Sequence, residues 1–193
     1  MTLTSSNIVL PGPVKIYVGT ASTTPPADTI AKGTAWGGSW VEVGFTKGGA
    51  VLKPETEKYS VEVDQYNAPI KDFIVKQTAQ MTFAVAEATL TNIKQAMGYG
   101  TITAGSTEST LGVGAADGIP TYNAFGFETY APGATAANSW YRRYIIWIGS
   151  AQEGPELKGD KGEEQLVSYS VTALVDPSQS ASERVYKVID RVV

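Results

Sequence analysis

The sequence predicts a mainly β fold, a β-sandwich or half-barrel flanked by one α-helix. Val, Ile, Thr and Tyr are prominent in a chain that is 42% hydrophobic, and β-branched and aromatic residues favour strands. Apolar and polar residues alternate in several separate segments, as they do in strands with one buried face. Only residues 89–97 show the spacing of an amphipathic helix.

Two N-terminal strands are expected, at residues 14–18 and 40–44, separated by a loop rich in Thr, Pro and Gly. The first segment alternates weakly. In the second, Trp40 has the phase opposite to that of Val41 and Val43. Apolar residues on both faces favour a strand that is covered on both sides.

The central stretch, residues 48–98, is predicted to form a strand, a long loop, a second strand and the helix. Residues 59–64 and 79–87 alternate between apolar and polar side chains. The segment between them has a hinge at residues 67–69, Asn-Ala-Pro, a composition typical of turns.

The first of these strands is expected to change course near Glu57. If Val61 and Val63 face the core, the same phase carries Glu57 and Glu55 inward, and unpaired buried carboxylates are costly. Pro54 agrees with this, because proline in sheets is confined to edges, bulges and strand starts. An edge hairpin and a β extension that reaches another subunit both satisfy this pattern.

The helix is predicted from its caps as well as its spacing. Thr89 is a suitable N-cap, and Gly98 stands where a left-handed C-cap is needed. The apolar stripe that would pack on the sheet is Leu90, Ile93 and Met97.

The C-terminal half is predicted to supply four strands. Residues 121–130 contain two phenylalanines in one phase, and residues 140–149 are apolar on both faces toward their end, which favours a central strand. Residues 166–175 return as the second half of a long hairpin. Residues 184–190 form the last strand.

These elements are expected to form one domain, residues 1–193. Residues 1–13 are polar and marked by proline, and we expect an N-terminal arm without a signal peptide or membrane helix. Residues 101–138 have no Lys or Arg and are expected to be a low-charge insertion. Residues 176–193 are the C-terminal segment.

The sequence lacks the side chains that most catalysis uses. It contains no histidine and no cysteine, so the usual nucleophile and base pairs and the common metal sites are missing. We therefore expect no enzyme, no cofactor and no metal. Glycoside hydrolysis needs a pair of carboxylates, and the candidate pairs are Glu55 with Glu57, Glu62 with Asp64, and Glu163 with Glu164. We expect these pairs to lie on solvated faces and not in a catalytic site.

Charge argues against tight nucleic-acid binding, because the net charge is -4 and the pI about 4.9. Arg142 and Arg143 are expected to pair with carboxylates. The aromatic residues leave open a carbohydrate-binding module, for which the candidates are Trp36, Trp40, Trp140 and Trp147.

Seven segments of the sequence form a pattern beyond single elements: 48–57, 61–65, 68–69, 81–90, 141–144, 172–177 and 185–189. Together they resemble the tail tube proteins of long-tailed bacteriophages. The resemblance covers most of the chain apart from residues 19–38 and 101–138.

The resemblance implies a tail-tube type of half-barrel that forms hexameric rings, which stack into a hollow tube. Viral DNA would pass through the lumen during ejection without specific binding. The implied partners are further copies of the chain and the tape measure, tail terminator and tail tip proteins. The implied location is the virion tail, assembled in the host bacterial cytoplasm. A tail terminator or a head decoration protein is an alternative virion part.

Two sets of residues acquire expected roles from this resemblance. The side chains expected to face the lumen are Glu62, Asp64, Gln80 and Thr82. Those expected in subunit and ring-stacking contacts are Pro54, Glu55, Glu57, Gln65, Tyr66, Asn67, Ala68 and Pro69.

Overall fold

The computed structural model describes residues 12–114, 118–134, 140–159, 161–162 and 164–191. This part of the chain contains ten strands and one helix, with antiparallel pairing throughout, so the mainly β prediction with a single helix is confirmed. The elements are β1 (Lys15–Thr20), β2 (Val41–Glu42), β3 (Thr46–Val61), β4 (Lys71–Val85), α1 (Leu90–Met97), β5 (Thr101–Ala104), β6 (Ser109–Gly112), β7 (Asn123–Tyr130), β8 (Tyr141–Ala151), β9 (Val167–Leu174) and β10 (Tyr186–Asp190).

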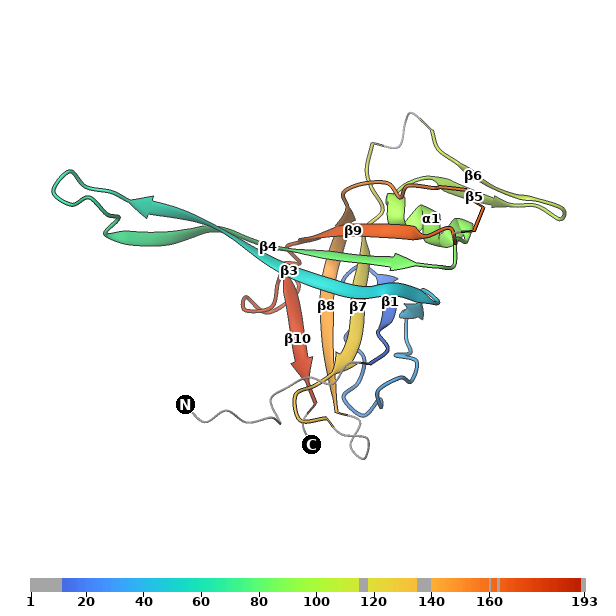
Figure 1. The fold of residues 1–193 in the computed structure, drawn as a ribbon, viewed down its shortest axis with the longest axis horizontal. Helices are drawn as coiled ribbons and strands as arrows, with labels where there is room; N and C mark the ends of the chain where they lie inside the picture. Colours follow the sequence, from blue (N-terminus) through green and yellow to red (C-terminus); the bar gives the residue numbers. More distant parts are fainter. Residues whose placement is uncertain (1–11, 115–117, 135–139, 160, 163, 192–193) are drawn as a thin grey trace.

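Eight of these strands form one sheet in the order β2-β1-β7-β8-β9-β4-β3, with β10 attached to β8. One edge of β8 pairs with β7, so β9 and β10 share its other edge. β10 pairs with residues 142–146 and β9 with residues 148–151. The sheet divides at this point, and β9, β4 and β3 cross the direction of β7, β8 and β10 (Figure 1).

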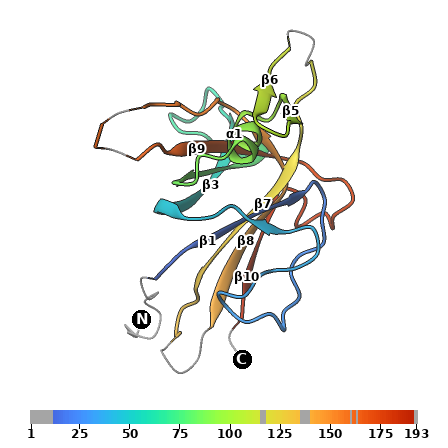
Figure 2. The same ribbon diagram turned by 90° about the vertical axis from the view of Figure 1, so that its right-hand side faces the viewer.

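The two parts of the bent sheet enclose the main core. The inward residues of β4 and β9 meet those of β1, β7 and β8, and α1 covers β9 (Figure 2). Phe83 stacks on Tyr169 with ring centroids 4.4 Å apart, and Phe125 meets Tyr169 edge-on. Burial of these aromatic side chains supplies much of the driving force for folding.

A second cluster covers the other face of β1, β7 and β8. It contains Tyr17 and Trp147 from the strands and Trp36 and Trp40 from the loop between β1 and β2. These three strands are therefore buried on both faces, which explains the uninterrupted burial of residues 124–128 in β7.

The strands of the C-terminal half agree with the sequence. Those predicted at residues 121–130, 140–149, 166–175 and 184–190 correspond to β7, β8, β9 and β10, and β8 is central as expected. The predicted hairpin of β8 and β9 is confirmed. The strand predicted at residues 14–18 corresponds to β1.

The strand predicted at residues 40–44 is present only as β2, which has two residues and lies at the edge of the sheet. Both residues of β2 are exposed, so the expectation of a strand covered on both faces was wrong. Val43 and Trp40 are buried, whereas Val41 is 66% exposed. Strand alternation does not continue to Val43, because the chain leaves the strand before Gly44, whose φ is +99°.

The central stretch contains much more strand than expected. β3 begins at Thr46 and ends at Val61, so Glu62 to Asp64 lie outside it. β4 begins at Lys71, in the segment that was expected to be a loop. The unbroken apolar run Phe73 to Val75 shows no alternation, since neither face of this part of the hairpin is covered within the chain.

The helix caps are confirmed. The Thr89 side chain accepts a hydrogen bond from the Asn92 amide, and Gly98 adopts φ +75°. Ile93 and Met97 contact the core cluster, and Leu90 is half-buried. No sequence pattern indicated that Asn92 is buried; its side-chain amide donates to the carbonyls of Val43 and Glu87.

The segment 101–138, expected to be a low-charge insertion, contributes to two places. β5 and β6 form a separate two-stranded hairpin beside α1. β7 lies in the middle of the main sheet between β1 and β8. The N-terminal arm expected at residues 1–13 lies outside the described residues except for its last two positions.

Candidate assembly interface

The most prominent external feature is the outer part of the β3–β4 hairpin. β9 pairs with β4 only from Gln80 to Val85. Residues 54–79, which we call the arm, therefore extend beyond the support of the rest of the sheet, and Figure 1 shows them projecting far from the body. Since an isolated two-stranded hairpin is only marginally stable in water, this shape indicates a segment that is completed by other contacts.

The arm contains a bulge where the sequence predicted a change of course. Glu57 is paired with Lys76 and Lys58 with Ile74, so Val75 is an extra residue without a partner across the ladder. A bulge of this kind bends the strand and increases its local twist. The expected irregularity at Glu57 is confirmed, although the inserted residue belongs to β4.

Beyond the bulge the two faces of the arm differ in polarity. Tyr59 lies directly opposite Phe73, and the ammonium of Lys71 lies 4.8 Å from the Phe73 ring centroid. On the other face the Ser60 hydroxyl donates to Asp72 over 2.7 Å. One face of the outer arm is thus aromatic and the other is mainly polar.

The arm exposes a concentration of large apolar side chains that is unusual for a solvated surface. Free strand edges accompany them, because β3 pairs only with β4 among the described residues and β4 lacks a second neighbour before Gln80. Exposed edges and apolar patches are typical of surfaces that join other chains. The exposed residues are Tyr59, Tyr66, Ile70, Phe73, Ile74 and Val75.

The end of the arm is a turn, residues 62–70, which we call the tip. The amide of Ile70 donates to the carbonyl of Val61 over 2.9 Å and closes the turn. Inside it the amide of Tyr66 donates to Val63. Tyr66 is 69% exposed, and the other residues from Gln65 to Pro69 are exposed as well.

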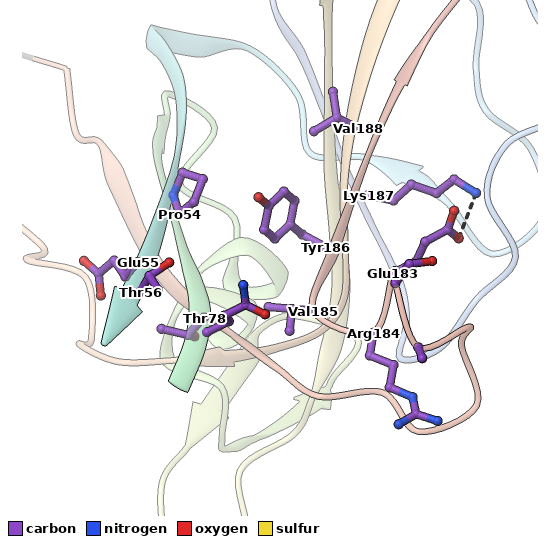
Figure 3. A pocket seen from close by; sticks show the side chains of 13 residues that line it. Pro54, Glu55, Thr56, Thr78, Glu183, Arg184, Val185, Tyr186, Lys187 and Val188 are labelled. Atoms are coloured by element: carbon purple, nitrogen blue, oxygen red, sulfur yellow. Dashed lines mark hydrogen bonds and ion pairs between the residues drawn. The ribbon is translucent and has the colours of Figure 1, made fainter. Parts of the chain in front are cut away.

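A groove lies at the opposite end of the arm, on the side of β10. It is a cavity of about 400 Å³ between the hairpin and residues 181–188. Figure 3 shows the Tyr186 ring pointing from β10 toward Pro54 of β3. The structure therefore separates the residues expected in subunit contacts: Pro54, Glu55 and Glu57 lie near the base of the arm, and Gln65 to Pro69 lie at the tip.

The residues expected to face the lumen also fall in two places. Gln80 and Thr82 lie on the face of β4 that points away from the core, beside the hydroxyl groups of β9, and the Gln80 amide donates to Ser170 over 3.2 Å. Glu62 and Asp64 lie in the tip. Alternation along a strand was the basis for grouping all four, and it does not extend to Glu62 and Asp64 because β3 ends before them.

The family model described as "Phage tail tube protein" matches residues 1–146, which is more than half of the chain and includes the whole arm. The chain belongs to the phage tail tube protein family. It is therefore a structural protein of the phage tail that assembles with copies of itself into the tube, and a component of the virion. No curated protein matches the chain.

The structure does not favour the carbohydrate-binding alternative for this tail tube protein. Of its four tryptophans, Trp140 is half-buried, whereas Trp36, Trp40 and Trp147 are almost fully buried, and Trp36 stacks on Tyr17 at 4.2 Å. The indole rings of these residues form part of the core and do not present a platform to a sugar. The family match also favours a tube subunit over a tail terminator or head decoration protein.

The two adjacent arginines pair with carboxylates, as predicted. Arg142 forms a bidentate pair with Asp190, with both N–O distances 2.6 Å, and this bonding raises the pKa of its guanidinium. Arg143 pairs with Glu128 inside the protein. Both arginines therefore serve the fold of the tail tube protein.

The described ranges offer little support for a metal site or a membrane-spanning helix. They contain no group of three or more acidic, histidine or cysteine residues that could hold a metal ion. No helix among these residues is long and apolar enough to cross a membrane. Membership of a structural family implies a role other than catalysis.

Sequence reasoning missed most of the arm's apolar surface and the whole groove. A usable signal was present in residues 70–75, where Ile, Phe and Val are frequent and strand propensity is high. The groove gave no such signal, since Pro54 and Tyr186 are 132 positions apart and meet only because β10 pairs with β8.

Proposed function

We propose that this chain forms hexameric rings that stack into the hollow tail tube through which the phage genome passes during ejection. The observation that carries the proposal is the arm, a projecting hairpin with exposed aromatic and β-branched side chains and unpaired edges. A surface of this kind gains stability when a neighbouring copy covers it.

Edge pairing between copies supplies the ring contact. The outer edge of β3 and the edge of β4 from Lys71 to Ala79 lie on opposite sides of one hairpin. If the β3 edge of one copy pairs with the β4 edge of the next copy, the contact is heterologous. Its repetition closes a ring, in which both edges of every copy are paired. A second heterologous contact along the axis then stacks the rings.

The lumen in this proposal is lined by the outward face of β4 and β9. Gln80 and Thr82 lie there beside Ser168 and Ser170, so this face is polar and carries no charge at these positions. Neutral hydroxyl and amide groups hold phosphates only weakly, and the chain as a whole is acidic. DNA would slide along such a surface without specific binding.

The remaining contacts of the proposal involve other virion proteins. The tube would enclose a tape measure protein and end at a tail terminator and a tail tip protein. Assembly would take place in the host bacterial cytoplasm. The family to which the chain belongs supports this context.

Electron microscopy of the purified protein over a concentration series tests the proposal. We expect hollow tubes or stacked six-membered rings above a critical concentration. A variant in which a short Asn-Gly turn replaces residues 56–77 should retain the β-rich circular dichroism spectrum and remain monomeric. A wild-type protein that stays monomeric at every concentration, with and without tape measure protein, would contradict the proposal.

A further inference from the structure

The two ends of the arm have complementary chemistry. The tip is a compact acidic projection with an exposed aromatic ring, and the groove at the base is a cavity with apolar side chains on its floor and Arg184 at its rim. The tip residues from Gln65 to Pro69, and Pro54 and Glu55 beside the groove, were expected in subunit contacts, but the sequence did not indicate the groove itself.

A single copy cannot join these surfaces. Seven residue steps of about 3.3 Å separate Pro54 from Val61 along β3, so the tip lies roughly 20 Å or more from the groove. The hairpin between them is paired on both sides of the bulge at Val75, and it holds the tip away from the body (Figure 1). The groove is therefore open to a second copy.

The floor of the groove continues the hydrophobic core outward. Val185 and Tyr186 pack against the core cluster and keep part of their surface in the cavity. Pro54 forms the opposite wall, and Val188 is 44% exposed at one end (Figure 3). An inserted aromatic or proline side chain would remove this apolar surface from water.

The rim of the groove carries one positive charge without an opposite partner. Glu183 is paired with Lys187 over 2.9 Å, and Glu55 with Lys53 over 3.0 Å. Arg184 is exposed and donates from Nε to the carbonyl of Gln179, and it forms no ion pair within the described residues. The rim therefore favours an anionic partner.

The tip provides such a partner. Residues 62–70 contain Glu62 and Asp64 and no cation, which gives a local charge of -2. Neither carboxylate forms an ion pair in the part of the chain that the structure describes. Tyr66 and Pro69 supply the exposed apolar groups beside them.

We propose that the tip of one copy seats in the groove at the arm base of the next copy, with Tyr66 against Tyr186 and Pro54 and the tip carboxylates beside Arg184. The inference rests on the proposed function and adds the specific partner surface. Because each copy carries the tip and the groove at opposite ends of its arm, the contact is head-to-tail and repeats along the assembly.

The absence of cysteine from the chain allows a direct test of this contact. Separately tagged variants Ala68→Cys and Ser182→Cys are mixed, assembled into tubes and oxidised mildly. We expect a mixed disulfide dimer that is identified by its two tags, because bridged Cα atoms must come within about 7 Å. The control pair, Ala68→Cys with Thr103→Cys in β5, should give no mixed dimer.

A charge reversal tests the chemistry independently. Arg184→Glu alone, or Glu62→Lys with Asp64→Lys, should raise the critical concentration for tube assembly at least about tenfold. The triple variant should return to within about threefold of wild type, because the reversed pair attracts again. Tyr66→Ala should weaken assembly to a similar degree, and Tyr99→Ala, on the other side of the body, should not.

The outcomes separate this contact from the proposed function. Two results together would overturn the seating of the tip and leave the tube proposal intact. They are normal tubes that give no mixed disulfide, and a triple variant whose critical concentration is as high as that of the separate reversals. Failure of the wild-type protein to form tubes at all would overturn both.

Discussion

Arg143 and Glu128 form an ion pair in the interior of the protein, with Nε 2.9 Å from Oε2 and each side chain 1% exposed. The pair also fastens the loop between β1 and β2. Glu128 accepts from the amide of Gly33 over 2.7 Å, and Arg143 donates to the carbonyls of Ala27 and Ile30. A loop without regular structure is thereby held against the second aromatic cluster.

Removal of one charge from this pair should be strongly destabilising. Glu128→Gln keeps the size of the side chain and leaves the Arg143 charge buried without an opposite charge, which costs about 3–5 kcal/mol. The matched control is Asp190→Asn at the partly exposed pair with Arg142, where we expect about 1 kcal/mol or less. Denaturant unfolding measures both, and equal losses for the two variants would contradict the assignment.

The helix caps give a second prediction. Thr89→Ala removes the acceptor for the Asn92 amide and should cost about 1 kcal/mol. Thr91→Ala, at an exposed position inside α1, should be neutral or slightly stabilising because alanine favours helix. Gly98→Ala should cost more than either, since φ is +75° and the new Cβ would lie 3.0 Å from that of Ala151. The midpoint temperature of thermal unfolding should therefore be highest for Thr91→Ala, lower for Thr89→Ala and lowest for Gly98→Ala.

The success of the cap prediction shows which features the sequence encodes locally. Thr89 and Gly98 act within one turn of the helix, so their roles can be identified without knowledge of the fold. Strand alternation is also local, but it needs one face in water and one in the core. It therefore predicted β9 well and failed for residues 70–78, where the chain's own core covers neither face.

Other features depended on contacts that the sequence does not specify. Val41 and Val43 share a phase, yet one is exposed and the other buried, since β2 ends after Glu42. The groove requires β10 to pair with β8 and the hairpin to cross above it. Such long-range arrangements are set by packing of the whole sheet.

Stability should fall at alkaline pH because of two buried tyrosines, Tyr17 and Tyr169. Burial, followed by the nearby carboxylates of Glu42 and Glu128, raises the pKa of the Tyr17 hydroxyl from 10 to about 12, and burial raises the pKa of the Tyr169 hydroxyl as well. Between these values the unfolded chain loses the proton first, so the folded state binds more protons and the free energy of unfolding decreases as pH rises. Tyr17 alone should contribute a loss on the order of 2 kcal/mol across this interval.

Variants at two tyrosines check this pH dependence. Tyr17→Phe should lower stability near pH 8, because the hydrogen bond to the Thr34 carbonyl is lost, and should make the decline between pH 10 and 12 shallower, leaving the part that Tyr169 contributes. Tyr59→Phe, at an exposed ring, should leave the curve unchanged. An equally steep decline in Tyr17→Phe would show that other groups cause it.

The bulge at Val75 should set the direction in which the arm projects from the body. Its deletion would let Glu57 with Lys76 and Lys58 with Ile74 follow in continuous register, which removes the local bend and added twist. The body should keep its stability, since the arm lies beyond the pairing with β9. Tube assembly should need at least about tenfold more protein, which corresponds to about 1.4 kcal/mol. Val75→Thr preserves the bulge and should assemble normally; normal assembly of the deletion would exclude a directing role.

Positive charge on the proposed lumen face should slow the passage of DNA. Thr82→Lys together with Ser170→Lys places two ammonium groups on the outward face of β4 and β9, where they would attract phosphates in every ring. Ejection from phage complemented with this variant should be slower than wild type, and the delay should shrink at high salt, because screening weakens the attraction.

The control for the lumen prediction places the same charge elsewhere. Thr107→Lys lies between β5 and β6, on the hairpin beside α1, and is exposed. It should leave the ejection rate unchanged. Electron microscopy must show normal tubes for both variants, so that a delay reflects passage and not assembly. If Thr82→Lys with Ser170→Lys forms normal tubes and ejects DNA at the wild-type rate, this face of β4 and β9 does not line the lumen.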